Sequence, residues 1–267
     1  MLFLCSWISR RQLTRYAYSF LVSEPDPPHA DFPEGWGGFA DVMHVDFKVP
    51  SEHTINGKRY DGEMQVYHLH PGRRRMPTVA TAIQATPDGY NWYFEGALKA
   101  FEFIYERDEA LCAATQRRGR QLVSDVHDKL GAESSGEHVD YTAWGDYSTI
   151  LDSPDYQEHE EHIERSLQNG RWDPHHEMLV PSIHFYRYEG SLTEPPCGEW
   201  ISWFITDKPM IISTEQLERM KNILFNHRDY ACRRTSTHYE ESVARPIQET
   251  AGRPIYLCTS ADFVADP

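Results

Sequence analysis

The 267-residue sequence lacks any long uninterrupted hydrophobic run. A membrane-spanning helix needs about 20 consecutive apolar residues, so the sequence predicts no transmembrane segment. The apolar start, residues 1–9, lacks the basic leader and the small-residue cleavage site of a secretory signal. No compartment can therefore be assigned from the N-terminus.

Basic residues are also scarce, since 26 Lys and Arg stand against 41 Asp and Glu and give a formal net charge of −15. Proteins that bind nucleic acid neutralise phosphates with clusters of Lys and Arg. Only two short basic stretches occur, at 73–75 and 117–120. Nucleic acid is therefore not an expected partner.

Cysteine is sparse and irregularly spaced. The five cysteines lie at positions 5, 112, 197, 232 and 258 and form no CxxC pair. This spacing argues against a cysteine zinc site, and the odd number leaves at least one thiol unpaired. One or two disulfides remain open, and no pairing is assigned to Cys197.

Hydrophobic alternation identifies a first strand at residues 41–49. A side-chain period of two places Val42, His44 and Asp46 on one face of this strand. A Pro- and Gly-rich stretch at 24–38 precedes the strand and is interpreted as a loop.

A second alternating segment covers residues 59–70 and places Glu63 and Gln65 side by side on one face. Asn56-Gly57, between the two segments, is a strong hairpin signal. Residues 43–70 are therefore expected to form neighbouring strands that face one cleft.

The rest of the chain predicts further strands and a few helices. Strands are expected at 77–86, 182–188 and 199–206, and helices at 94–130 and 214–224. Residues 131–178 form an acidic, polar excursion with a short helix near 156–168. Many short strands with few helices indicate a mainly β structure with peripheral helices.

Three stretches together resemble one protein family. The first is Ser51-Glu52-His53-Thr54 with Tyr60, Glu63, Gln65 and His68 downstream. The second runs from Tyr188 to Cys197 (YEGSLTEPPC) with Glu199 and Trp203. The third combines Ser213-Thr214-Glu215-Gln216, Arg245-Pro246-Ile247-Gln248 and Arg253. In this order they resemble the signatures of α-class (eukaryotic-type) carbonic anhydrases.

The resemblance implies the α-carbonic anhydrase fold, with a large central, twisted and mostly antiparallel β-sheet. It covers a single domain over residues 41–260. Residues 1–40 show none of the family's N-terminal pattern, and are either a divergent segment or the remnant of a longer gene.

The resemblance also implies a zinc chemistry. In the family, two histidines at i and i+2 of one strand and a third from the next strand hold zinc. Zinc lowers the pKa of its bound water to near 7, and the hydroxide attacks carbon dioxide. A threonine pinned by a glutamate orients that hydroxide.

Carried over by position, the orienting pair is Thr193 and Glu52, and the ligand positions hold His44, Asp46 and Gln65. Two of the three histidines are thus replaced, and neutral Gln is a poor zinc ligand. The cofactor is therefore zinc or none.

Some of the residues around these ligand positions match the family pattern, and others differ from it. Glu63 is kept beside Gln65, and the resemblance assigns it a hydrogen bond to His53, with Tyr188 nearby. Val42 stands where the family has a supporting Gln for the first ligand. The pocket wall is assigned to Tyr67, Leu192 and Trp203, with Tyr67 replacing a small aliphatic residue.

Other histidines offer weaker alternatives. His68-Leu69-His70 has ligand spacing, but both histidines are expected to point away from the face of Glu63 and Gln65. His159-Glu160-Glu161-His162 and His175-His176 are interpreted as solvated residues of the polar excursion.

Two functions remain in view. The first is a carbonic anhydrase-like protein with lost or weak carbon dioxide hydratase activity, serving as a module that binds a protein or surface partner. The alternative is an active zinc enzyme that interconverts carbon dioxide and bicarbonate through an atypical site. An unrelated hydrolase is less favoured, because no GxSxG elbow occurs. Family habit favours the secretory route, the cell surface or an organelle lumen.

Overall fold

The computed structural model describes residues 28–32, 39–70, 72, 75–128, 172–194, 196–229, 232–235 and 240–259. The short helix predicted near 156–168 lies outside these residues, as do most of the polar excursion and most of residues 1–40.

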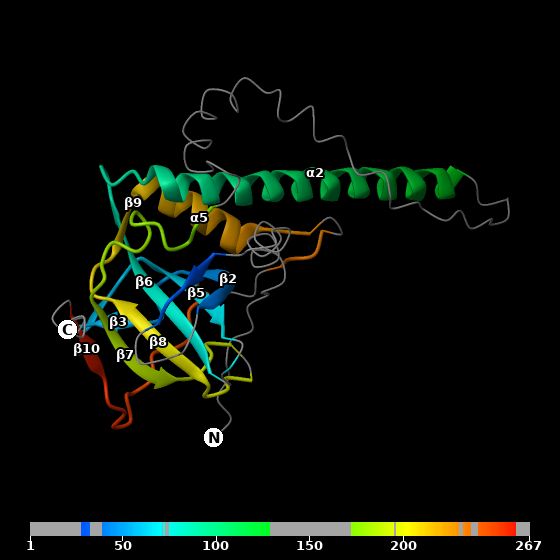
Figure 1. Ribbon diagram of the computed structural model, residues 1–267. Helices are drawn as coiled ribbons and strands as arrows, with labels where there is room; N and C mark the ends of the chain where they lie inside the picture. Colours follow the sequence, from blue (N-terminus) through cyan, green and yellow to red (C-terminus); the bar gives the residue numbers. More distant parts are fainter. Residues whose placement is uncertain are drawn as a thin grey trace.

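One large curved sheet dominates the described part of the chain (Figure 1). Its strands are β1 (His29–Ala30), β2 (Ala40–Lys48), β5 (Gly62–Leu69), β6 (Met76–Thr86), β7 (Phe185–Gly190), β8 (Ile201–Thr206), β9 (Met210–Ser213) and β10 (Tyr256–Cys258). Their order is β1-β2-β5-β6-β8-β7-β10, and β9 pairs with β6. Only the β6–β8 and β6–β9 pairings are parallel, so the predicted, mostly antiparallel sheet is confirmed.

A tight hairpin connects β2 to β5. Its strands are β3 (Thr54–Ile55) and β4 (Lys58–Arg59), which pair antiparallel. The turn residues Asn56 and Gly57 have φ of 52° and 77°. Two consecutive positive φ values are the backbone that an Asn-Gly hairpin turn requires, so the predicted turn is confirmed.

β2 and β5 pair antiparallel, as predicted, but the pairing contains a β-bulge. The register shifts between Val42, which faces His68, and His44, which faces Tyr67. Met43 is the extra residue, and an extra residue reverses the side-chain alternation. The expectation that Val42 shares a face with His44 and Asp46 is therefore wrong.

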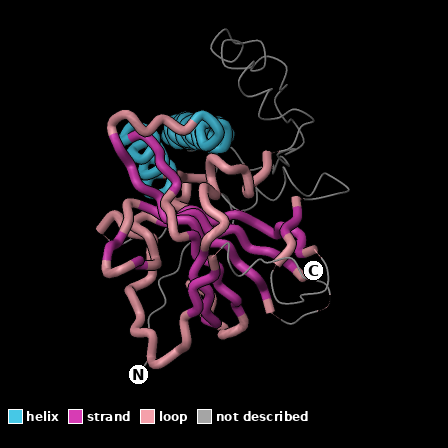
Figure 2. Tube along the Cα trace, turned by 60° about the vertical axis from the view of Figure 1, so that its left-hand side comes forward, coloured by secondary structure: helices cyan, strands magenta, loops and turns pink. Residues whose placement is uncertain are grey.

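Two helices cover one face of the sheet (Figure 2). They are α2 (Trp92–Asp128) and α5 (Thr214–Asn226). Both were expected, and each has a side-chain cap. The Asn91 side chain accepts a hydrogen bond from the Phe94 amide at 2.9 Å, and Ser213 and Gln216 form a capping box. The two helices lie side by side, and α2 continues well past α5 (Figure 1).

The main apolar core fills the space between the sheet and these helices. It contains Val42, Val45 and Phe47 of β2, Met64 and Val66 of β5, and Phe94, Leu98 and Met220 of the helices. The bulge therefore lets β2 place Val42 in the same core as Val45 and Phe47. A smaller core on the other face includes Tyr67, Leu192 and Trp203.

Residues 172–180 fold back onto the base of α2. The ring of His176 stacks on Tyr93 with centroids 3.8 Å apart, and His175 contacts His68 of β5. His175 and His176 are half-buried, so the interpretation of this pair as solvated residues is wrong. Apolar residues of this segment, such as Trp172, pack against the main core and so keep the segment close to it.

A disulfide between Cys112 and Cys232 ties α2 to the loop that follows α5. Cys197 is also disulfide-bonded. Within the described residues, no helix has the length and apolar character needed to cross a membrane.

Candidate functional site

Six polar side chains share the face of the β2–β5 ladder that lies opposite the helices. They are His44, Asp46 and Lys48 on β2, with Glu63, Gln65 and Tyr67 on β5. Each residue is at most 8% exposed. The ladder thus brings the three predicted ligand positions, His44, Asp46 and Gln65, onto one buried face, and it adds a lysine to them.

The Lys48 ammonium group lies among carboxylates. Its Nζ atom is 3.4 Å from Asp46 Oδ2 and 3.1 Å from Glu194 Oε1. Burial by itself would lower the pKa of Lys48, but the neighbouring carboxylates, led by Asp46, outweigh burial and raise it. Lys48 is therefore a permanent cation inside this face.

Gln65 is held by three neighbours. Its Nε2 atom donates to Glu52 Oε2 at 2.9 Å and to Glu63 Oε1 at 2.7 Å. Its Oε1 atom accepts a hydrogen bond from the Tyr67 hydroxyl at 2.8 Å. Both the nitrogen and the oxygen of the Gln65 amide are therefore hydrogen-bonded to protein partners.

His44 lies against an aromatic ring. It stacks on Tyr67 with ring centroids 4.4 Å apart, and its Nε2 atom is 3.9 Å from Asp46 Oδ1. Tyr67 is fully buried and also meets Trp203 edge to face. The predicted pocket-wall residues Tyr67, Trp203 and Leu192 pack together in the smaller core.

A hydrogen-bonded chain runs from Glu63 to the surface of the sheet. His53 Nδ1 is 2.8 Å from Glu63 Oε1, and His53 Nε2 is 2.8 Å from the Tyr188 hydroxyl. Burial would lower the pKa of His53, but the Glu63 carboxylate raises it. Burial would raise the pKa of Glu63, and its contacts with His53 lower it. The structure thus places Glu63, His53 and Tyr188 in direct contact.

Glu52 and Thr193 line the same cleft, which has a volume of about 330 Å³. The Glu52 carboxylate accepts hydrogen bonds from Gln65 Nε2 and, at 2.8 Å, from the Arg245 backbone amide. The Thr193 hydroxyl lies beside the Tyr67 hydroxyl. The expected threonine–glutamate pair therefore shares a cleft, and Glu52 binds other donors within it.

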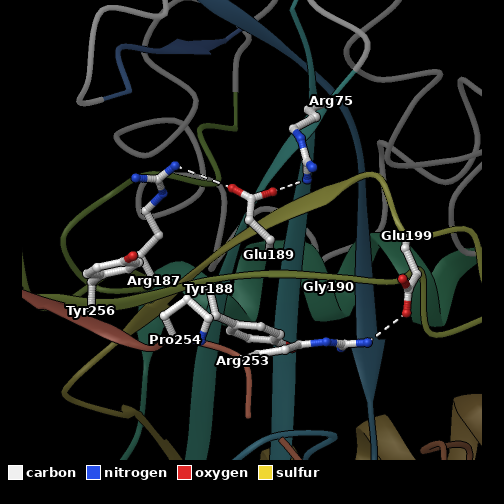
Figure 3. A pocket seen from close by; sticks show the side chains of 9 residues that line it. All are labelled: Arg75, Arg187, Tyr188, Glu189, Gly190, Glu199, Arg253, Pro254 and Tyr256. Carbon is white, nitrogen blue, oxygen red and sulfur yellow. Dashed lines mark hydrogen bonds and ion pairs between the residues drawn. The ribbon is translucent and has the colours of Figure 1, made fainter. Parts of the chain in front are cut away.

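A larger pocket of about 630 Å³ shares Tyr188 and Arg253 with this cleft. Figure 3 shows Glu189 between Arg75 and Arg187, with both arginines paired to it, and Arg253 reaching Glu199 along the Tyr188 ring. Both glutamates of this pocket are paired, and its three arginines leave one net positive charge. The predicted ligand positions His44, Asp46 and Gln65 line neither this pocket nor the cleft of about 330 Å³.

Comparison with known proteins finds similarity to one family. A model of the eukaryotic-type carbonic anhydrases matches residues 142–259. Alpha carbonic anhydrase 8 of Arabidopsis thaliana is 25% identical over 216 residues, which cover 81% of this chain and 37% of that protein. The chain is therefore similar to the α-carbonic anhydrases, through the family model over residues 142–259 and through relatives along most of its length.

Carbonic anhydrases of other organisms also match. A carbonic anhydrase of Pectobacterium carotovorum is 35% identical over 78 residues, which cover 29% of this chain and 26% of that protein. The α-carbonic anhydrase of Thermovibrio ammonificans, solved with sulfanilamide, aligns with a TM-score of 0.42 at 20% identity and covers 82% of this chain and 63% of that one. The chain spans less than two thirds of the curated relatives it matches.

Zinc, the metal that the α-carbonic anhydrase family implies, does not fit the donors on this face. The Asp46 carboxylate already pairs with the Lys48 ammonium, and the Gln65 amide is neutral and its oxygen already accepts a hydrogen bond from Tyr67, which makes it a poor zinc ligand. Within the described residues, no three His, Cys, Asp or Glu side chains form a group that could hold a metal ion.

Sequence reasoning missed Lys48 and Glu194 as members of this carbonic anhydrase-like site. The signal for Lys48 was present, because it follows Asp46 by two residues and the strand period places both on one face. Glu194 is 146 residues away from Lys48 in the chain, and no local pattern joins them.

Proposed function

We propose that this α-carbonic anhydrase-like protein has lost, or keeps only weakly, the zinc-dependent hydration of carbon dioxide. The observation that carries the proposal is the buried Lys48 ammonium, 3.4 Å from Asp46 and 3.1 Å from Glu194. The Lys48 ammonium is a fixed positive charge, and it neutralises carboxylates that a metal ion would otherwise neutralise.

Electrostatic repulsion supports the loss of the metal. Two unit charges roughly 4 Å apart interact by about 4 kcal/mol at an effective dielectric constant near 20, and a divalent ion doubles this figure. An ion bound by Asp46 would lie close to the Lys48 ammonium and would meet such a repulsion. It would also have to take the carboxylate away from an ion pair that is already formed.

The register of β2 adds a second reason. The family pattern requires two ligand positions at i and i+2 of β2, on the face that carries Gln65. His44 with Asp46 meets this requirement, and Asp46 with Lys48 meets it equally. In the first arrangement one imidazole remains, and in the second none does. Neither arrangement supplies the three imidazoles that the family chemistry uses.

The surrounding scaffold is nevertheless kept. Glu63, His53 and Tyr188 form a continuous hydrogen-bonded chain, and Glu52 fixes both Gln65 and the Arg245 amide. These contacts are intramolecular and stabilise the fold without a metal. We infer that the cleft of about 330 Å³ serves binding of a protein or surface partner.

The test is metal content combined with a carbon dioxide hydration assay, with and without added zinc. We expect less than 0.1 equivalent of zinc in the cleft and no sulfonamide-sensitive turnover. Stoichiometric zinc at the cleft with sulfonamide-sensitive hydration would contradict the proposal and favour the active enzyme.

A set of restoring variants sharpens the test. Asp46→His with Gln65→His keeps Lys48 and uses His44 as the third ligand, whereas adding Lys48→His creates three imidazoles and removes the ammonium. We expect zinc binding only when Lys48 is replaced. Zinc binding by the double variant would show that His44 occupies the first ligand position and that the ammonium is no obstacle.

A further inference from the structure

A second pair of histidines lies on the helix-covered face of β5, away from the cleft. His68 shares this face with Met64 and Val66 of the main core, and His175 reaches it from residues 172–180. The two Nε2 atoms are 2.7 Å apart, and the ring centroids are 5.0 Å apart. Nitrogen atoms this close must share a positively charged species or a proton.

The other ring nitrogens fix where the protons are. His68 Nδ1 lies 3.2 Å from the Pro77 carbonyl oxygen, which can only accept, so this nitrogen carries a hydrogen. His175 Nδ1 lies 3.1 Å from Asp173 Oδ1. A carboxylate is ionised at neutral pH and can then only accept, so His175 Nδ1 also carries a hydrogen.

In the neutral rings, both Nε2 atoms consequently present lone pairs to each other. Two lone pairs 2.7 Å apart repel unless an electron-pair acceptor lies between them. The pattern is the one found around metal-binding histidines, whose second nitrogen donates to a carboxylate or to a backbone carbonyl. Here Asp173 provides the carboxylate and Pro77 the carbonyl.

One side of the pair is closed and the other is open. His68 is fully buried, and burial of an imidazole favours its neutral form, which is the form that binds metals. The His175 side chain is 20% exposed, so ions and water can reach the pair.

We propose that His68 and His175 bind one divalent transition-metal ion through their Nε2 atoms, with water completing the coordination. Imidazole suits copper, zinc and nickel, and the general affinity order favours Cu²⁺ among them. Each imidazole contributes one lone pair, and no covalent bond is broken. This site is independent of the proposed loss of zinc from the cleft.

The geometry requires only a small adjustment. A tetrahedral ion about 2.0–2.1 Å from each nitrogen needs the two nitrogens roughly 3.3 Å apart. His68 is fixed within strand β5, whereas His175 lies on an irregular, surface-facing segment. A shift of the His175 ring by less than about 1 Å therefore accommodates the ion.

The experiment is a calorimetric titration of the full chain with Cu²⁺ and, separately, Zn²⁺ at pH 8. We compare the wild type with His175→Ala, and with His184→Ala as the control, since His184 is a surface histidine paired to Asp207 at 3.8 Å. We expect His175→Ala to lose one metal equivalent, or to weaken that equivalent at least 100-fold. His184→Ala should leave it unchanged.

Asp173→Asn tests the anchoring of His175 and leaves both ligands in place. Loss of such a carboxylate partner weakens metal binding by about 10- to 100-fold, so we expect a weakening in this range. Copper bound to the wild type should show hyperfine coupling to two imidazole nitrogens in electron paramagnetic resonance, and copper bound to His175→Ala should not.

Two outcomes would overturn the proposal. The first is equal stoichiometry and affinity in the wild type and His175→Ala. The second is ¹⁵N-histidine spectra at pH 8 in which a proton shared by the two Nε2 atoms persists in excess Zn²⁺. Gln65→Ala separates this site from the cleft, because it should leave the His175-dependent equivalent intact whatever the cleft binds.

Discussion

The two faces of the β2–β5 ladder are both buried, but different interactions stabilise them. One face presents Val45, Met64 and Val66 to the helices and is held by the hydrophobic effect, which needs no partner of fixed direction. The other presents Asp46, Lys48 and a set of further polar groups, which are buried nearly as completely. These groups are stable only because each charge meets a counter-charge or a hydrogen bond. The apolar face thus tolerates the exchange of one apolar side chain for another. The polar face of the same two strands is stable only while its charged and polar groups keep their partners.

The largest expected effect comes from breaking the charge balance of the polar face. Lys48→Ala leaves the carboxylates of Asp46 and Glu194 buried without their cation, and removing one partner of a buried ion pair costs about 3–5 kcal/mol. We expect a loss of this size in the free energy of unfolding, measured by urea denaturation.

The control for this variant is Lys221→Ala, which removes a partly exposed lysine paired with the exposed Glu218. An exposed pair contributes less than about 1 kcal/mol. Removing the charges together, by Lys48→Met with Asp46→Asn and Glu194→Gln, should recover part of the loss. A Lys48→Ala protein as stable as the wild type would refute the dependence on pairing.

On the apolar face, Val66→Ala should cost less. It deletes two buried carbon atoms from a fully buried side chain, and at about 0.8 kcal/mol per carbon plus a cavity contribution the loss is about 2 kcal/mol. Urea denaturation measures it under the same conditions, and Val66→Ile serves as a size control. A loss larger than that of Lys48→Ala would reverse the comparison between the two faces.

The smallest effect concerns pH. The raised pKa of His53 means that its stabilisation is complete below its ordinary value of 6.5 and is lost as the pH rises through the higher folded-state value. The lowered pKa of Glu63 means that its stabilisation is complete above 4.5 and is lost as the pH falls through the lower folded-state value. The pair therefore stabilises the fold most between about pH 4.5 and 6.5.

We expect the difference in Tm between the wild type and Glu63→Gln to be largest in this window and to shrink in more alkaline buffer. Thermal unfolding from pH 4 to 9 measures it. A difference that does not change with pH would show that His53 stays neutral in the folded protein.

Much of the fold follows from local sequence pattern. Period-two alternation predicts β2, β5 and β6, and Asn56-Gly57 predicts the hairpin because few residues adopt two consecutive positive φ values. The capping box predicts the start of α5 at Thr214. The short strands β1, β9 and β10 were not predicted, since two to four residues carry too little pattern.

The candidate site was predictable only in part. The face shared by Asp46 and Gln65 follows from the alternation of side chains along the strands. The placement of Val42 depends on a β-bulge, and no residue type within 40–44 indicates that bulge. The contact between His68 and His175 joins residues 107 positions apart. Such contacts are set by packing of distant segments, which sequence periodicity does not encode.

The sequence by itself determined the resemblance to the α-carbonic anhydrases and predicted that expected zinc histidines are replaced, because both conclusions need only residue identity in order along the chain. The tertiary structure alone decided which side chains surround the predicted ligand positions and which distant histidines meet. It brought Lys48 to Glu194 and His68 to His175, because burial in a medium of low polarity forces every charge and lone pair to find a partner, wherever in the chain that partner lies.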